Sequence, residues 1–448
     1  TMLATVTGNE NTAIGNDSLK ALTTGNNNVA AGANALAANT TGNFNTAVGE
    51  SALVTNQTGA DNVAIGHDTL KTNTVSKNTA VGKAAMELTT TGGENTAIGY
   101  SALYANTSGT NNVAMGRSAL VANTTASNNV AAGKSALAAN TTGANNVVIG
   151  ESAGLAATTS TGNVVIGQEA VKTGAFTGFN NVVIGKLAGE DLTSADANVI
   201  IGEDAGKNQT TADNNVLIGQ GAAEANLTGA NNVAIGNLAL AANTTASDNV
   251  SVGQTSLMAN TTGTGLTVLG TAAGRFNTTG NNNTYLGMNS GYTNVTGTQN
   301  VAVGHSALNL NTTNNNTAVG FYALRVNTTG TGNASLGYAS LDANTTGSNN
   351  TAIGSDSLTT NTTASSNSAF GANALAANTT GYDQTAAGYR ALTTNTTGFR
   401  NTAFGSDSLL LNTTGYDNSA FGKSALQDNT VGEANTGLGN YALANNTT

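Results

Sequence analysis

The chain has 448 residues and a formal net charge of −10, yet only 8% of its residues are charged and only 4% are aromatic. It contains no Cys, which excludes disulfides and thiolate metal sites. The scarcity of basic residues argues against a phosphate-binding surface for nucleic acid. No apolar run approaches the roughly eighteen residues that a membrane-spanning helix needs, so membrane insertion is not expected.

In chain order, the predicted elements are copies of one repeat. The motif Asn-(Thr/Val)-Ala-(Ile/Val)-Gly ends in a glycine that recurs 26 times, first at Gly15 and last at Gly439. Of the 25 intervals between these glycines, 22 are 17 residues, two are 16 and one is 18. We number positions in each repeat from this anchor glycine, so that the motif Asn is at −4. A period this strict predicts one structural unit per repeat, stacked on neighbours of the same kind.

Each repeat predicts one short strand. The residue at position −3 is β-branched in 23 of the 26 repeats, which favours a strand, and Gly and Asn-Thr-Thr-Gly segments on either side mark turns. Seventeen residues are too few for a pair of helices. The predicted fold is therefore an all-β parallel β-solenoid, or β-roll, of about 26 coils. We expect residues 1–448 to form a single continuous array without distinct caps or a second domain.

The ends of the sequence also fall inside repeats. Gly8 holds the turn position that Gly25 holds in its coil, and the last residues, 446–448, lie within a turn. Because a solenoid normally needs caps to protect its exposed edges, we expect the chain to be either part of a longer array or a subunit that stacks end to end.

The Asn at position −4 occurs in 24 of 26 repeats, with Leu266 and Gln384 as the exceptions. At a bend of a stacked coil, an Asn amide can donate to and accept from its copies above and below. The pattern therefore predicts an asparagine ladder along the solenoid, which is a structural role and not a catalytic one.

Two other positions change together. Position −2 is small in 19 repeats, and position +4 is then Leu or, once, Met, as in the pair Ala131 and Leu137. In the other seven repeats position −2 is large and position +4 is small or Val, as in Val148 and Gly154. A packed interior resists both voids and overfilling, so the exchange predicts that the two positions share one volume of core. The pattern leaves open whether they meet within one chain or across a subunit boundary.

Strand parity indicates a second apolar face. Positions −3 and −1 point to the side opposite position −2, and both sides carry apolar or β-branched residues. A solitary solenoid buries only its inner face. We therefore expect the outer face to be covered by lateral association of copies, most simply as a homotrimer, although a fibre of another symmetry satisfies the same argument.

The segment 45–53, AsnThrAlaValGlyGluSerAlaLeu, with Asn56-Gln57-Thr58-Gly59 after it, resembles the head repeats of trimeric autotransporter adhesins. It resembles still more closely the Asn-Thr-Ala-Ile-Gly repeats of phage tail-fibre and bacterial surface proteins. The resemblance covers nearly the whole chain and implies a trimeric parallel β-roll that projects from a surface and binds host or matrix. The adhesin heads have a shorter coil, and nothing here is similar to their stalk or membrane anchor.

Candidate chemistry is sparse. The two histidines, His67 and His305, follow anchor glycines at a variable position and lack a repeated acidic partner, so a surface role is expected. Carboxylates are scattered on the same exterior corner, where solvation is the expected role: Asp17, Asp68, Glu151 and Glu203. Calcium-binding Gly-x-Gly-x-Asp repeats are absent. We predict no catalytic residue, no cofactor and no metal site.

The Asn at position +7 offers one modification site. In most repeats Ser or Thr follows it two residues later, which is the acceptor pattern for N-glycosylation. An alternative explains the same residues as a turn Asn in the left-handed conformation, followed by a ladder of Thr hydroxyls. This alternative is favoured. The possible acceptors are Asn39, Asn56, Asn106, Asn123, Asn140, Asn243, Asn260, Asn277, Asn311, Asn327, Asn344, Asn361, Asn378, Asn395 and Asn412.

The sequence thus favours a non-enzymatic structural or adhesive fibre shaft, located extracellularly, on a cell surface or on a virion. Its expected partners are further copies of itself and a cell-surface receptor or glycan. The alternative is an architectural extracellular filament that recognises no receptor. Ice binding ranks below both, because adjacent threonines point to opposite sides of a strand.

Overall fold

A computed structural model describes residues 7–448 of the chain. These residues form β-strands and turns and contain no α-helix. Each repeat contributes one strand of three residues. The described residues divide into two units, a first that ends at Thr228 and a second that runs from Gly229 to Thr448. The first unit holds β1 (Thr12–Ile14), β2 (Val29–Ala31), β3 (Thr46–Val48), β4 (Val63–Ile65), β5 (Thr79–Val81), β6 (Thr96–Ile98), β7 (Val113–Met115), β8 (Val130–Ala132), β9 (Val147–Ile149), β10 (Val164–Ile166), β11 (Val182–Ile184), β12 (Val199–Ile201) and β13 (Val216–Ile218). The second unit holds β14 (Val233–Ile235), β15 (Val250–Val252), β16 (Thr267–Leu269), β17 (Thr284–Leu286), β18 (Val301–Val303), β19 (Thr317–Val319), β20 (Ala334–Leu336), β21 (Thr351–Ile353), β22 (Ser368–Phe370), β23 (Thr385–Ala387), β24 (Thr402–Phe404), β25 (Ser419–Phe421) and β26 (Thr436–Leu438).

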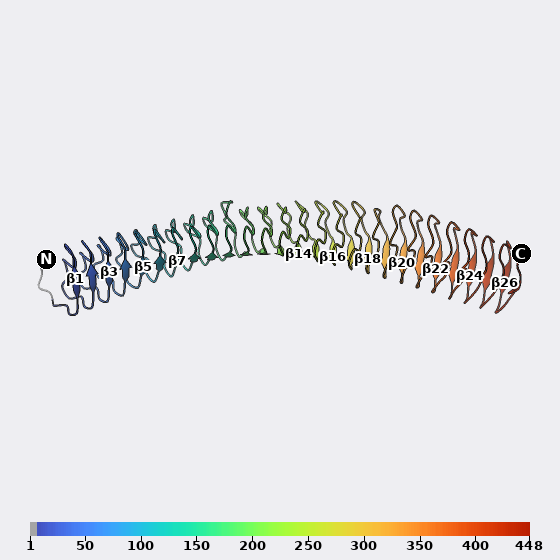
Figure 1. The fold of residues 1–448 in the computed structure, drawn as a ribbon, viewed down its shortest axis with the longest axis horizontal. Coiled ribbons are helices and arrows are strands. Elements are labelled where there is room, and N and C mark those ends of the chain that lie inside the picture. Colours follow the sequence, from blue (N-terminus) through green and yellow to red (C-terminus); the bar gives the residue numbers. More distant parts are fainter. Residues whose placement is uncertain (1–6) are drawn as a thin grey trace. The chain divides into compact units, whose positions relative to one another are not determined.

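Within each unit, every strand pairs in parallel with the strand of the next repeat, and these strands lie side by side in Figure 1. The register joins equivalent positions, as between Thr46 and Val63. It is kept where a repeat is one residue shorter, since Val63 still pairs with Thr79. The predicted parallel β-solenoid with a 17-residue coil is confirmed, and the changes in repeat length are absorbed in the turns.

The interior of each coil is filled by positions −2, +3 and +4. In the coil of β8, Ala131 and Ala136 are fully buried, and Leu137 is 1% exposed. In the next coil, a Cβ atom on Gly154 would lie 3.4 Å from Val148 Cγ1. A leucine there would overlap the valine, because its side chain extends well beyond Cβ. Positions −2 and +4 therefore meet within one chain, which answers the question that the sequence left open.

The anchor glycines stack closely. Gly49 has φ +132°, a backbone conformation that residues with a side chain rarely adopt. A Cβ atom on it would overlap the carbonyl oxygen of Gly66 in the next coil. The same overlap recurs along both units. The invariance of this glycine is therefore explained by the close approach of successive backbones.

The chain bends into the core through left-handed residues. The leucines at position +4 have positive φ, for example 50° at Leu53 and 52° at Leu137. This conformation costs a bulky residue about 1–2 kcal/mol, and burial of the side chain offsets it. Gly154 adopts the same φ of 56° without that cost. The small-for-large exchange thus changes both the packing and the backbone strain of a coil.

Candidate functional site

The Asn residues at position −4 form the predicted ladder. Asn112 lies directly before β7, and its backbone N–H donates to Asn95 Oδ1 at 2.9 Å. Its Nδ2 donates to the same oxygen at 3.1 Å. Nδ2 also donates to the backbone carbonyl of Ala126 at 2.8 Å. These Asn side chains are buried in every coil except the first and the last, where Asn11 and Asn435 are partly exposed. The ladder therefore satisfies buried backbone groups of successive coils, as expected.

The Asn residues at position +7 form a second ladder, which the sequence analysis did not identify. Asn123 Nδ2 donates to Asn106 Oδ1 at 3.0 Å, and Asn140 Nδ2 donates to Asn123 Oδ1 at 3.0 Å. These residues do not have positive φ, so the expected left-handed conformation was wrong. The left-handed residues are instead at +2, +4 and the position before the motif Asn. The recurrence of Asn at +7, in 20 of the 26 repeats, was the available signal.

The second ladder includes every candidate glycosylation acceptor. Each is fully buried, and its Nδ2 donates to a backbone carbonyl two or three residues further on: Asn39, Asn56, Asn106, Asn123, Asn140, Asn243, Asn260, Asn277, Asn311, Asn327, Asn344, Asn361, Asn378, Asn395 and Asn412. A glycan is attached at this same nitrogen and needs solvent around it. The geometry therefore favours the structural alternative. The following Thr hydroxyls donate to carbonyls of the next coil, as Thr107 Oγ1 does to Thr124 O at 3.0 Å.

The outer face of the strands is the most extensive candidate site. We call the two columns of side chains at positions −3 and −1 the outer stripe. Neither position is charged in any of the 26 repeats. Many side chains at −1 are 39–53% exposed: Val48, Ile65, Ile98, Met115, Ile149, Leu269, Leu336, Ile353, Phe370, Phe404 and Phe421. The predicted second apolar face thus exists, and the single chain leaves it open to solvent.

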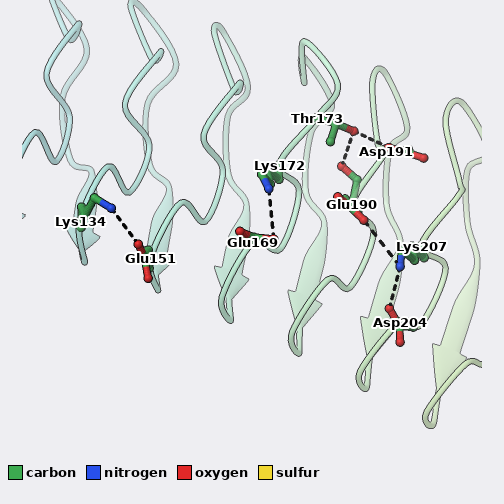
Figure 2. A network of polar contacts seen from close by, with 9 residues as sticks. All are labelled: Lys134, Glu151, Glu169, Lys172, Thr173, Glu190, Asp191, Asp204 and Lys207. Atoms are coloured by element: carbon green, nitrogen blue, oxygen red, sulfur yellow. Dashed lines mark hydrogen bonds and ion pairs between the residues drawn. The ribbon is translucent and has the colours of Figure 1, made fainter.

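The charged residues lie beside the outer stripe in columns of their own. Lys134 Nζ is 3.0 Å from Glu151 Oε1 one coil further on, and Figure 2 shows similar pairs along the following coils. Lys207 Nζ is 3.2 Å from Asp204 and 3.9 Å from Glu190. The hydrogen bond to Asp204 raises the pKa of Lys207. Some of these pairs, such as Lys134 with Glu151, join neighbouring coils, whereas others, such as Lys207 with Asp204, lie within one coil. They do not converge on a common point.

The other predicted surface carboxylates lie in similar pairs. Asp17 is 3.4 Å from Lys20, and Glu203 is 3.8 Å from Lys186. Asp68 is 3.1 Å from Lys71, and their hydrogen bond raises the pKa of Lys71. These carboxylates are thus ion-paired and not merely solvated.

The two histidines have different surroundings. His67 Nδ1 is 3.0 Å from Asp68, and its Nε2 is 3.8 Å from Glu50 of the preceding coil. The expectation that it lacks an acidic partner was therefore wrong, because stacking brings residues 17 apart together. The ring of His305 stacks on Phe321 with centroids 5.1 Å apart. His67 is exposed, as expected, whereas His305 is only partly exposed.

Stacked aromatic columns in the second unit were not predicted. Tyr382, Phe399 and Tyr416 stack with centroids 5.1 and 4.9 Å apart and nearly parallel planes. Phe404 and Phe421 stack in the outer stripe at 5.4 Å. Aromatic residues at one position of three successive repeats were the available signal. Because the rings cover one another's faces, the columns present mainly ring edges to a partner.

Within residues 7–448, no three His, Cys, Asp or Glu side chains are grouped as metal ligands, and no helix is long and apolar enough to cross a membrane. No protein-family model matches the chain, and no curated protein matches it significantly in sequence. The fold and its columns of side chains are therefore the basis for a functional proposal.

Proposed function

We propose that this protein is a non-enzymatic fibre shaft that associates laterally with further copies of itself. The observation that carries the proposal is the outer stripe, an exposed strand face without a charged residue in any repeat. Soluble monomers rarely expose contiguous apolar patches of this extent. Exposed sheet edges are commonly protected from association by charged side chains. The outer stripe carries no such charges.

The area of the outer stripe fits an interface. A Phe side chain has a surface of about 150–250 Å², and the aliphatic side chains at position −1 lie near or below the lower end of this range. At the observed exposures of 39–53%, the most exposed side chains at position −1 together present on the order of 700 Å². A standard interface buries about 800 Å² on each partner. The stripe therefore has the size of a standard interface, and the resemblance of the repeats to those of trimeric adhesin heads favours a homotrimer as the closed arrangement.

Such a shaft fits a surface adhesin or a phage tail fibre, placed outside the cell or on a virion. The exposed aromatic columns of the second unit support the adhesive version, because aromatic and Arg side chains dominate recognition surfaces. Arg400 lies 4.9 Å from the centre of the Phe399 ring. A receptor or glycan is the proposed target of this surface.

A purely architectural filament is the second candidate. It is favoured by the regularity of the side-chain columns, since most coils carry the same two buried ladders and every coil carries the uncharged outer stripe. Binding of the chain to host cells or glycan arrays, with loss of binding in Tyr382→Ala and Phe399→Ala variants, would support the adhesive version. Polymerisation without any such binding would support the filament.

Sedimentation equilibrium of the chain tests lateral association. We expect a discrete oligomer, with a trimer as the leading case, and elongated particles by electron microscopy. A well-folded monomer at micromolar concentration would overturn the proposal, because the outer stripe would then be stable in water.

A further inference from the structure

A hollow lies on the surface of the first unit, next to the residues that lead into β1, β2 and β3. It has a volume of about 430 Å³ and is lined by Asn9, Glu10, Asn26, Asn27, Asn43 and Phe44. These residues hold positions −6 and −5 of three successive repeats. The parallel register of the three strands places equivalent positions side by side, so the hollow spans three coils. None of its residues belongs to the outer stripe or to the aromatic columns.

The fold does not account for Phe44. Its φ of +55° is left-handed, a conformation that costs a bulky side chain free energy. Position −5 is Asn, Asp or Gly in 17 of the 26 repeats, and Phe44 is its only aromatic residue. Burial offsets the same cost at the leucines of position +4, but 60% of Phe44 is exposed. Residues held in such conformations collect at ligand sites, so contact with a ligand explains this Phe.

The polar side chains of the hollow are partly fixed and partly free. The backbone N–H of Asn9 donates to Asn26 Oδ1 at 2.7 Å, and that of Asn26 donates to Asn43 Oδ1 at 2.8 Å. Within residues 7–448, the side chains of Glu10 and Asn27 take part in no hydrogen bond or ion pair. A carboxylate accepts hydrogen bonds, and an amide both donates and accepts them. The two free side chains are therefore available to a ligand.

The charge and polarity of the lining exclude several classes of ligand. No Lys, Arg or His lines the hollow, so a phosphate, sulfate or carboxylate group would meet Glu10 without a compensating cation. One ring is the only apolar side chain, so a lipid or an apolar peptide would leave the amides without partners. A neutral sugar meets both demands, because its C–H groups pack on the face of an aromatic ring and its hydroxyls donate and accept as an amide does.

We propose that this hollow binds a neutral pyranose unit of a glycan. The sugar ring lies on Phe44, and its hydroxyl groups exchange hydrogen bonds with Asn27 and Glu10. The outer two coils of the site are two strand spacings, or about 10 Å, apart, which leaves room for a ring with its substituents. The site needs no association of copies, so this inference goes beyond the proposed shaft.

A cationic peptide is the competing ligand. A carboxylate and the face of a ring also attract an ammonium group. Such a group only donates hydrogen bonds, however, and would leave Asn27 Nδ2 without an acceptor. The hydroxyls of a sugar provide that acceptor, which favours the glycan.

Ligand-detected NMR of the full-length chain tests the site. The probes are the methyl glycosides of glucose, galactose, mannose, N-acetylglucosamine and N-acetylgalactosamine, with tetralysine as the cationic competitor. We expect at least one glycoside to bind with a Kd on the order of 1 mM, because one ring and two polar side chains bury little of the ligand. Tetralysine should bind at least about tenfold more weakly.

Substitution of Phe44 should remove binding without harming the fold. Asn holds position −5 in ten repeats, so Phe44→Asn suits the left-handed backbone. We expect Kd to rise at least about tenfold, with an unfolding temperature that is equal or higher. Asn27→Ala should raise Kd about threefold or more. Phe179→Ala is the matched control, because Phe179 is 46% exposed and does not line the hollow.

The inference is overturned if none of the five glycosides binds, or if Phe44→Asn and the unmodified chain have equal Kd values. Stronger binding of tetralysine would assign the hollow to cations instead. Loss of glycoside binding in Phe179→Ala or Tyr382→Ala would place the sugar elsewhere on the chain. Sedimentation of Phe44→Asn separates this inference from lateral association, because the oligomer should be unchanged while glycoside binding is lost.

Discussion

At the scale of single residues, the buried Asn side chains join one coil to the next. The backbone N–H and Nδ2 of Asn112 both donate to Asn95 Oδ1. Its Nδ2 also donates to the backbone carbonyl of Ala126. The exceptions show which of these bonds the chain can lose. Leu266 still donates its backbone N–H to Asn249 Oδ1 at 3.0 Å, but it has no amide to continue the ladder. The column thus tolerates single gaps in a long series.

Replacing a ladder residue should destabilise the folded chain. Asn112→Ala removes three hydrogen bonds of the side chain. It leaves the buried backbone N–H of Asn129 without its acceptor, so we expect a loss of about 2 kcal/mol. Thermal unfolding of this variant against Thr125→Ala, an exposed turn residue, measures the difference. Equal midpoints for the two variants would contradict the structural role of the ladder.

The buried Tyr285 predicts an alkaline limit to stability. Its ring fills the interior beside Gly291, and burial raises the pKa of its hydroxyl well above the ordinary value of 10. The folded state therefore holds this proton more tightly than the unfolded state. The resulting stabilisation is complete below pH 10 and is lost as pH rises above it, by up to about 1.4 kcal/mol per pH unit.

Tyr285→Phe keeps the ring and removes the ionisable hydroxyl. We expect the unfolding midpoint of this variant to fall less steeply between pH 9.5 and pH 11.5 than that of the unmodified chain, by the slope of about one proton. Tyr338→Phe, at an exposed site, is the matched control and should follow the unmodified chain. Parallel curves for all three proteins would exclude Tyr285 as the origin of the slope.

At the scale of one coil, two solutions to the same packing problem alternate along the chain. A small residue at position −2 is combined with a strained, left-handed Leu, whereas a large residue is combined with an unstrained Gly in most cases. In three of the five large-residue coils of the first unit, position +7 is not polar but is Ala157, Gly174 or Leu192, and Phe176 is buried close to Gly174 in the sequence. The core is therefore adjusted coil by coil, while the strand register stays the same.

A double-mutant cycle at Ala131 and Leu137 measures this exchange. Ala131→Val alone overfills the coil, and we expect a cost of about 1–3 kcal/mol. Leu137→Gly alone leaves a cavity, at about 2–5 kcal/mol less any strain relieved. In the double variant the valine fills that cavity, so the costs should fall short of additivity by at least 1 kcal/mol. Chemical denaturation measures all four proteins, and strict additivity would show that the positions do not share volume.

At the scale of the whole molecule, the residues proposed for association, those of the outer stripe, differ from the residues that fold each coil. Its side chains point away from the interior, so the hydrogen bonds and core of each coil do not depend on them. The burial of identical stripes would join copies without any change within the coil. Stability of the chain and association of the chain are therefore expected to respond to different substitutions.

Charges on the outer stripe should dissociate the assembly without unfolding it. Ile98→Glu combined with Ile149→Glu places two carboxylates on the outer stripe. The two Ile residues that they replace are 44% and 41% exposed in the single chain. Because buried unpaired charges are costly, we expect a shift from oligomer to monomer in sedimentation with an unchanged circular dichroism spectrum. Thr142→Glu on the turn controls for net charge. Oligomers that survive the double substitution would place the interface elsewhere.

The sequence by itself determined the coil length, the strands, the first Asn ladder and the coupled core positions, because the repeats form an alignment within one chain and strand parity is a local property. Only the tertiary structure decided which residues meet across a coil. It placed Val148 against Gly154 within one chain, brought Glu50 to His67, and buried Asn123 in a second ladder. Those contacts depend on how the turns fold back on the strand, and the turns do so through left-handed residues that periodicity does not reveal.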